Sequence, residues 1–334
     1  SWASGTEVMT SWDYEMSQLE NHDAVLVAPA TRNTISKHIH GIMDSPVLMA
    51  LSAARGNGTP TLFVPSMHSD IFDDSVTRDL LETLRDEGSA VMISEIEEGR
   101  RKQPDPISIV ANFCNMVNKE LSGRKIVAIT LGANRAPIDD VRAIQNASSG
   151  STGWTIAEYL HRMGHHVICI AGKTSAYPSF TLPDVRRAGS PDSMLSVAKT
   201  VASEQPQPDA WIHSAAVLDY YTEPINGKKP SGDDPWELIL IPGVKHIAEL
   251  SPLVDGAIRI GFKLESDVSD ELLVLKAKEQ IERYGVDAVV ANLKDEIHDP
   301  DTLRGRFVRS DGTVDDIHDD AELCQMIESL LNAA

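Results

Sequence analysis

The sequence contains few cysteines, and none of them are paired at a metal-binding spacing. Cys114, Cys169 and Cys324 are far apart, and such an odd, scattered set forms neither a disulfide framework nor a zinc site. No stretch approaches the roughly 18 apolar residues of a membrane-spanning helix, and the opening SWASGTEVMTSWDYE lacks a basic segment followed by an apolar one. We therefore expect a cytoplasmic protein with no membrane partner.

Positive charge is also scarce. The chain has 30 Lys and Arg against 50 Asp and Glu, which gives a formal net charge of −20. The resulting field repels polyphosphate, and this argues against nucleic acid or an anionic membrane as a partner. A small phosphorylated ligand must then be held by a local group of basic side chains and backbone N–H donors.

The motifs of dinucleotide-binding enzymes are absent as well. The sequence has no G-x-G-x-x-G, and none of its six tyrosines is followed by Lys at the fourth position. An NAD(P)-dependent oxidoreductase is therefore an alternative that lacks its fingerprint. A non-catalytic flavoprotein-like binding module is a second alternative, and it predicts no nucleotide turnover.

Short apolar runs alternate with longer amphipathic stretches. The expected strands are Ala24–Val27, Thr61–Val64, Ala90–Ser94, Lys125–Thr130, His166–Ala171, Ala210–Ala216, Ile258–Phe262 and Ala288–Ala291. The expected helices are Ser75–Glu87, Ile107–Glu120, Thr155–Met163, Met194–Glu204, Asp270–Tyr284 and Ala321–Leu331. Because parallel strands need crossovers, the alternation predicts the α/β class with two doubly wound (Rossmann-like) parallel-sheet domains. The interruption NKELSGR places their boundary between 1–118 and 119–334.

A long connection follows the expected strand Lys125–Thr130. The next helix is not expected before about Trp154, so this is not the tight turn of a dinucleotide fold. Small residues let backbone amides approach an anion ahead of a helix, and Arg neutralises phosphate. The candidates are Gly132, Arg142, Asn146, Ser148, Ser149 and Gly150. The alternatives are simple helix capping, and glycosylation at the sequon Asn146-Ala147-Ser148, which a cytoplasmic setting disfavours.

Three later segments are expected at the same edge of the sheet. Ligands gather outside the carboxyl ends of parallel strands, which places Asp219 and the backbone of His213, Ser214 and Ala215 there. Lys228 and Lys229, flanked by Gly and Pro, suit a mobile clamp for a triphosphate, and Phe262 suits stacking on a base. Each also has an ordinary interpretation: a loop cap, a solvated surface pair and a core aromatic.

Together these segments resemble the phosphopantothenate-cysteine ligase domain of coenzyme A biosynthesis, which is commonly fused to a phosphopantothenoylcysteine decarboxylase. The resemblance runs from about Leu121 to the C-terminus through ITLGANRAPIDDVRAIQNASSGSTG, SAAVLDYY, KK, GFKLES and DAVVANLKD. It implies ligation of 4'-phosphopantothenate to cysteine through an acyl-nucleotide anhydride. It also implies Mg²⁺, CTP or ATP as co-substrate, and a homodimer.

The resemblance also implies residue roles. Asn146 matches the asparagine that handles the acyl-nucleotide intermediate, and Lys229 matches the mobile-loop lysine, so both are expected to be catalytic. His213 to Ala215, Asp219 and Phe262 match the nucleotide site, and Arg142 with Asn146 is expected to bind the acyl substrate. Gln280 and Tyr284 stand where bacterial members place two nucleotide-binding lysines, which leaves the choice between CTP and ATP open.

The first domain resembles the flavin-dependent decarboxylase half of the fused protein. The resemblance covers Asp23 to Ile109 through VLVAPATRNTISKHIHGIMDSPV and LFVPSMHSD, and it implies a partial flavodoxin-like domain. In that family the APAT-x-N-T segment helps to bind flavin mononucleotide (FMN). The opening strand and Gly-Ser loop of the family are absent from this sequence, and we expect an N-terminally incomplete copy.

The catalytic groups of a decarboxylase are also missing. The position of the catalytic histidine falls at about Glu15, the segment Glu95 to Pro106 lacks the cysteine, and His68 replaces an asparagine. Three histidines lie nearby, His22, His38 and His40, and their ordinary interpretation is as surface or core residues. We therefore expect no FMN-dependent decarboxylation, and a domain that serves as a scaffold.

Overall fold

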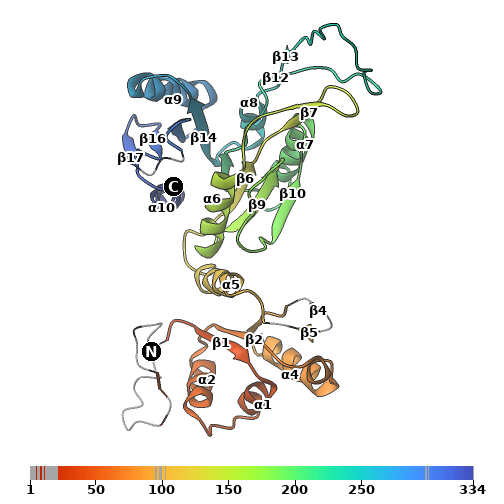
Figure 1. Cartoon of the computed structure of the whole chain (residues 1–334). Helices are drawn as coiled ribbons and strands as arrows, with labels where there is room; N and C mark the ends of the chain where they lie inside the picture. Colours follow the sequence, from red (N-terminus) through yellow and green to blue (C-terminus); the bar gives the residue numbers. More distant parts are fainter. Residues whose placement is uncertain are drawn as a thin grey trace. The chain divides into compact units, whose positions relative to one another are not determined.

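The computed structural model describes residues 22–94, 96–97, 100–101, 103–297, 299 and 301–333, together with positions 5, 8, 9 and 11. The expectations made at Glu15 and at Glu95, Glu98, Gly99 and Lys102 fall outside the described residues. The chain divides into two compact units, Ser1–Asn118 and Lys119–Ala334 (Figure 1). None of the helices in the described ranges is long and apolar enough to cross a membrane.

The first unit contains a parallel sheet with the strand order β1-β2-β3. Its strands are β1 (Val25–Ala30), β2 (Thr61–Pro65) and β3 (Ala90–Val91), and its helices are α1 (Arg32–Ile39), α2 (Pro46–Asn57), α3 (Ser69–Phe72), α4 (Ser75–Asp86) and α5 (Pro106–Asn118). A separate pair joins β4 (Ile96–Glu97) to β5 (Arg100–Arg101). The core forms where Leu80 and Leu84 of α4 pack with Phe63 of β2 and Leu51 of α2.

The second unit is built on an eight-stranded sheet with the order β10-β9-β6-β11-β14-β15-β16-β17. The strands are β6 (Ile126–Leu131), β9 (His166–Ala171), β10 (Asp184–Arg187), β11 (Ala210–His213), β14 (Ile258–Glu265), β15 (Ala288–Leu293), β16 (Gly305–Arg309) and β17 (Val314–Ile317). The strands from β10 to β15 are parallel, and this confirms the predicted α/β class. Two strands that were not predicted, β16 and β17, pair antiparallel at one edge of this sheet.

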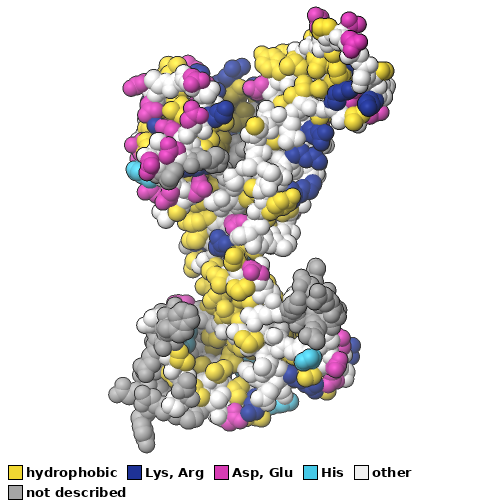
Figure 2. Space-filling model, in the orientation of Figure 1, with side chains coloured by type: hydrophobic (Ala, Val, Ile, Leu, Met, Phe, Trp, Pro, Cys, Tyr) yellow, Lys and Arg dark blue, Asp and Glu magenta, His cyan; other side chains and the backbone are white. Residues whose placement is uncertain are grey.

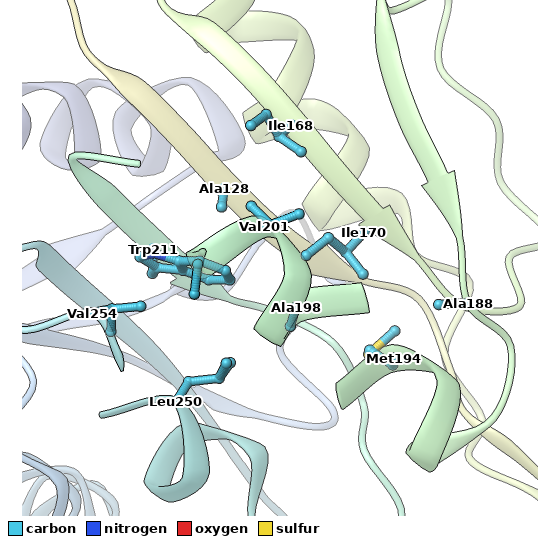
Figure 3. Packing of buried hydrophobic residues seen from close by; sticks show 11 residues of the cluster. Ala128, Ile168, Ile170, Ala188, Met194, Ala198, Val201, Trp211, Leu250 and Val254 are labelled. Carbon is cyan, nitrogen blue, oxygen red and sulfur yellow. The ribbon is translucent and has the colours of Figure 1, made fainter. Parts of the chain in front are cut away.

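Helices cover both faces of this sheet. On one face, α7 (Pro191–Ala202) and α8 (His246–Leu250) pack around Trp211, Ile168 and Ile170 (Figure 3), and α9 (Asp270–Tyr284) packs on β15 beside them. On the other face, α6 (Ser151–Arg162) packs on Leu131 of β6 and contacts α10 (Asp320–Ala333). Fully burying a large apolar side chain contributes about 1.5–3 kcal/mol to the free energy of folding. The two helical layers therefore stabilise the sheet.

The strand order reverses between β6 and β11. The chain leaves β6 for β9 and β10 on one side and then returns to β11 on the other, with Thr130 of β6 paired to His213 of β11. Connections that diverge from neighbouring parallel strands leave a crevice outside their carboxyl ends. The segments expected to bind ligands follow these two strands.

Several boundaries differ from the predictions. β11 ends at His213 and not at Ala216, although the N–H groups of Ser214 and Ala216 still donate to the carbonyls of Thr130 and Gly132. The long connection after β6 contains a ribbon of β7 (Arg135–Pro137) and β8 (Ala143–Gln145). A second ribbon of β12 (Tyr220–Tyr221) and β13 (Ile241–Pro242) lies at the base of an extended arm, before the short helix Ser251–Leu253 (Figure 1).

Candidate active site at the reversal of strand order

Helix α6 begins within the segment predicted to hold phosphate. Its first residue is Ser151 rather than about Trp154, and its N-cap is Gly150 with φ +81°. A Cβ added at Gly150 would lie 2.6 Å from Thr174 Cγ2 and 3.3 Å from Gly132 Cα, so a side chain there would collide with its neighbours. Gly150 therefore lets two backbone segments meet and brings the positive end of α6 to the crevice.

The loop ahead of α6 is fixed by its own hydrogen bonds. Ser149 O accepts from the N–H groups of Ser175 and Ala176 at 3.1 Å each, and the Ser149 hydroxyl accepts from Ser151 N–H at 3.3 Å. Gly150 contributes no side chain to cap the helix. Helix N-termini of this kind are anion-binding sites because unpaired N–H groups and the helix dipole act together.

The residues after β11 lie directly beside this helix start. Ser214 donates from its hydroxyl to Thr130 O at 2.8 Å, which ties the end of β11 to β6. A Cβ added at Gly153 of α6 would lie only 2.9 Å from Ser214 Oγ and 2.4 Å from Leu131 Cβ. The structure thus brings Gly132, Ser149, Gly150 and Ser214 close together, and their role as a binding site stays a prediction.

Asn146 joins the two sides of the crevice. Its Nδ2 donates to Ala216 O and to Val217 O, each at 3.1 Å, with the amide assigned in the orientation that satisfies both carbonyls. A primary amide has two N–H hydrogens, so both are used and Oδ1 remains to accept. Asn146 therefore holds the backbone after β11 in place through Nδ2 and presents Oδ1 as an acceptor.

A buried carboxylate organises the two cations expected to meet phosphate. Asp139 accepts from the N–H of Val141 (2.8 Å), the N–H of Arg142 (2.7 Å), the Arg142 guanidinium and Lys229 N–H (3.2 Å). Burial alone would raise the pKa of Asp139, but the backbone N–H donors and Arg142 lower it to about 2. Asp139 therefore stays ionised and holds the backbone of Lys229 next to Arg142.

Trp236 completes this cluster. The Lys229 ammonium lies 4.7 Å from the centre of its ring, and the Arg142 guanidinium lies 5.3 Å from it. Lys228 is exposed beside them. Neither Asp139 nor Trp236 was singled out from the sequence, although an Asp three residues before an Arg and a lone aromatic in a Gly- and Pro-rich segment were available as signals.

The remaining predicted residues have mixed positions. His213 has its ring stacked on Trp211 at 6.1 Å, and burial with repulsion from Arg259 and His246 lowers its pKa to about 3, so its imidazole is neutral near pH 7. Phe262 is half-buried on β14 beside β11. Asp219 is exposed and forms an ion pair with Lys245, so its carboxylate is already compensated.

No protein cage for a metal ion is visible. Among the residues that the structure describes, no three His, Cys, Asp or Glu side chains gather as a metal site. Mg²⁺ bound with a nucleotide usually takes most of its ligands from phosphates and water, with one or two carboxylates. The chain is therefore compatible with Mg²⁺ that arrives on a triphosphate, and no residue is assigned to it.

In the described part of the first unit, the polar side chains at the carboxyl end of β1 are engaged with one another. At the carboxyl end of β1, the Thr31 hydroxyl caps α1 by accepting from Thr34 N–H at 3.2 Å. The cation in that turn, Arg32, is paired with Asp74 at 2.7 Å, and Asp74 itself caps α4. Backbone N–H groups at a helix start can hold a phosphate, and here the first turns of α1 and α4 are capped by the side chains of Thr31 and Asp74.

Comparisons with known proteins agree with this division of the chain. The model of the DNA/pantothenate metabolism flavoprotein C-terminal domain (DFP) matches residues 121–322, and the flavoprotein model matches residues 2–118. The coenzyme A biosynthesis bifunctional protein CoaBC of Thermococcus kodakarensis is 35% identical over 271 residues, which are 81% of this chain and 66% of that protein. The protein of the same name from Mycobacterium tuberculosis is 28% identical over 313 residues, 87% of this chain and 73% of its own length.

A solved structure shows the same fold. The DNA/pantothenate metabolism flavoprotein from Streptococcus pneumoniae is 23% identical, with a TM-score of 0.56, and the match covers 63% of this chain and 99% of that one. The matched region spans just under two thirds of the Thermococcus relative. With the family model matching more than half of its residues, the chain belongs to the DNA/pantothenate metabolism flavoprotein (DFP) family.

Proposed function

We propose that the second unit ligates 4'-phosphopantothenate to cysteine in coenzyme A biosynthesis, with a nucleoside triphosphate as co-substrate. The observation that carries the proposal is the junction of the α6 N-terminus, the Asn146 segment and the residues after β11 at the reversal of strand order. An anion-binding helix start beside a row of backbone carbonyls suits a reaction between a phosphate and an acyl group. The DFP match supports coenzyme A biosynthesis as the setting.

The first step joins the acyl carboxylate to the nucleotide. The carboxylate attacks the α-phosphorus, pyrophosphate leaves, and an acyl-nucleotide anhydride forms. Negative charge grows on phosphate oxygens in this step, so the N–H groups at Gly150 and the Arg142 and Lys229 cations stabilise it. Mg²⁺ neutralises the triphosphate when it is bound. Lys229 has to leave Trp236 to follow the charge, which a lysine on a Gly- and Pro-flanked segment can do.

The second step transfers the acyl group to cysteine. The cysteine amine attacks the acyl carbonyl carbon, the nucleoside monophosphate leaves with the bonding electron pair, and the amine loses a proton. Asn146 holds the carbonyls of Ala216 and Val217 in place and has Oδ1 left to accept from an incoming amine. In this role Asn146 orients the nucleophile, and the N–H groups at the start of α6 donate to the anhydride.

The test is pyrophosphate release from CTP or ATP, measured with and without each substrate. We expect release that requires 4'-phosphopantothenate, and 4'-phosphopantothenoylcysteine only when cysteine is present. The comparison of CTP with ATP identifies the nucleotide, which Gln280 and Tyr284 leave open. No release with either nucleotide would favour the binding-module alternative, and a reduced nicotinamide spectrum in the presence of substrate would favour the oxidoreductase.

For the first unit we propose a scaffold without decarboxylase activity. Its support is the compensated Arg32 turn and the histidines of the unit: His38 is buried against Phe63 at a ring distance of 5.4 Å, whereas His22 and His40 are exposed. The purified protein is expected to be colourless and to release no CO₂ from 4'-phosphopantothenoylcysteine. A yellow protein with a flavin absorption spectrum would contradict this.

A further inference from the structure

Three cations lie at the ends of strands on the side of the crevice away from His213 and Asp219. Arg135 is in the connection after β6, Lys173 is two residues after β9, and Arg187 is the last residue of β10. The strands β6, β9 and β10 are parallel neighbours, so these residues share one edge of the sheet. Figure 2 shows Lys and Arg side chains gathered over this part of the second unit, near β7 and β10.

Lys173 and the backbone of Arg135 contact Gly189, and Arg187 contacts α6. Lys173 is anchored by paired hydrogen bonds with Ala133 at 2.8 Å, and its side chain lies over Gly189, where an added Cβ would be 3.8 Å from the ammonium. Arg135 N–H donates to Gly189 O at 2.8 Å. The Arg187 guanidinium lies 5.4 Å from the ring centre of Trp154, in the first turn of α6.

Their charges have no internal counterpart. In the described part of the chain, none of the three forms an ion pair, whereas the adjacent Arg186 pairs with Asp184 and Glu204. Helix α7 also begins here, at the N-cap Ser190, so the positive end of its dipole adds to the cations. All three residues are exposed, and in a chain of net charge −20 they form a local region of positive charge that attracts a small anion.

We propose that Lys173 and Arg187, with Arg135 on the same edge of the sheet, form a second phosphate subsite next to the N–H groups that begin α6. This inference rests on the proposed function, in which two phosphorylated substrates meet at one edge of the sheet. The nucleoside is expected beside β11 and β14, where Phe262 lies, so the opposite side is left for another phosphate. The anion is the 4'-phosphate of the acyl substrate or the terminal phosphate of the nucleotide, and the chemistry of recognition is the same for both.

Binding of inorganic pyrophosphate tests the subsite without turnover. Calorimetry on the full chain should give a Kd about fivefold higher for Lys173→Gln and for Arg187→Gln, the scale of one charge-assisted contact at a partly exposed site. Lys199→Gln removes the same charge on the outer face of α7, where Lys199 pairs with Glu249, and should leave the Kd unchanged. Lys173→Arg keeps the charge and should retain tight binding.

Steady-state kinetics then identify the source of the phosphate. If the subsite takes the 4'-phosphate, both Gln variants raise the KM for 4'-phosphopantothenate and leave that for the nucleotide unchanged; if it takes the terminal phosphate, the pattern reverses. An unchanged Kd for pyrophosphate and unchanged KM values in both folded variants would overturn the subsite. If the Gln variants bind pyrophosphate more weakly but the parent chain shows no ligase turnover, the subsite is supported and the proposed function is overturned.

Discussion

At the scale of single residues, the active-site candidates act mainly through backbone groups. Asn146 holds two carbonyls, Ser214 ties β11 to β6, and Gly150 and Gly153 permit close packing. Side-chain chemistry is concentrated in Arg142 and Lys229, and both depend on the buried Asp139. Reasoning from charge alone would not predict a carboxylate beside two cations that are expected to bind phosphate. Asp139 is useful there because it orders the backbone of the cationic loop.

Replacement of Asn146 tests this view of the crevice. Asn146→Asp places a carboxylate against two backbone carbonyls that now accept hydrogen bonds, so the segment after β11 should move. We expect turnover to fall about a hundredfold or more, the scale of losing one preorganised group, and Lys229→Gln should cause a similar loss. The measurement is cysteine-dependent release of AMP or CMP.

Asn57→Asp, at the exposed end of α2 in the first unit, is the control for the added charge and should keep full activity. Near-normal release in both active-site variants would refute the assignment of Asn146 and Lys229.

At the scale of elements, the start of α6 depends on tight contact with β6. Gly153→Ala would bring a Cβ to 2.4 Å from Leu131 Cβ, inside a well-packed layer. We expect the free energy of unfolding of the second unit to fall by about 1–3 kcal/mol, the usual cost of overpacking, with a measurable loss of activity. Urea denaturation followed by circular dichroism measures the change.

The matched control is Gly232→Ala in the arm. An added Cβ at Gly232 meets nothing within 4 Å, and Gly232 is not among the glycines with positive φ, so stability should change little or increase slightly. Equal losses in the two variants would show that the contact between α6 and β6 does not decide the result.

Helices and strands could be predicted where their buried residues form a simple apolar pattern in the sequence. β9 and α9 have the expected bounds, because an unbroken apolar run and a capped amphipathic stretch are strong local signals. α1 was missed because only Ile35 and His38 of its residues are buried, and β10 was missed because the sequence DVRR reads as surface. Tertiary contacts stabilise both, and no local pattern reports those contacts.

At the scale of the whole molecule, buried histidines make stability depend on pH. Burial, with repulsion from nearby cations, lowers the pKa of His38 and His165 from 6.5 to about 4 and that of His213 to about 3. The unfolded chain then binds more protons than the folded one below pH 6.5, so stability is full above that pH and falls as the pH drops towards 4. A fully buried imidazole such as His165 contributes roughly 2–3 kcal/mol to this loss.

Urea unfolding at about pH 7.5 and about pH 4.5 measures the effect. His38→Leu removes one of these imidazoles from an apolar site. The free energy of unfolding of the first unit should then depend less on pH, without being lower near neutral pH. The same slope in the variant and the parent chain would exclude His38 as a source.

The arm carries a large exposed apolar surface. Its exposed residues are Tyr220, Ile225, Leu238, Ile239, Leu240, Ile241 and Val244, and Ile239 is 80% exposed. Figure 2 shows hydrophobic side chains gathered over the arm. A continuous apolar patch of this kind indicates an interface, and we propose that a second copy of the chain covers it as a homodimer.

Sedimentation of the parent chain and of Ile239→Asp tests the dimer. The parent should sediment as a dimer and the variant as a monomer at the same concentration. Leu275→Asp changes another exposed apolar residue, on α9, and should stay dimeric. A parent chain that sediments as a monomer would contradict the proposed homodimer.

The sequence by itself determined the α/β class, the strong buried strands, and the motif residues that identify the family, because these depend on local apolar periodicity and on short runs of residues. Only the tertiary structure decided which residues act together. Three contacts join positions some 70 to 90 residues apart: β6 pairs with β11, Asn146 donates to the carbonyls of Ala216 and Val217, and Lys229 N–H donates to Asp139. Such contacts arise from the packing of the sheet and its connections, and packing is a property of the folded chain as a whole.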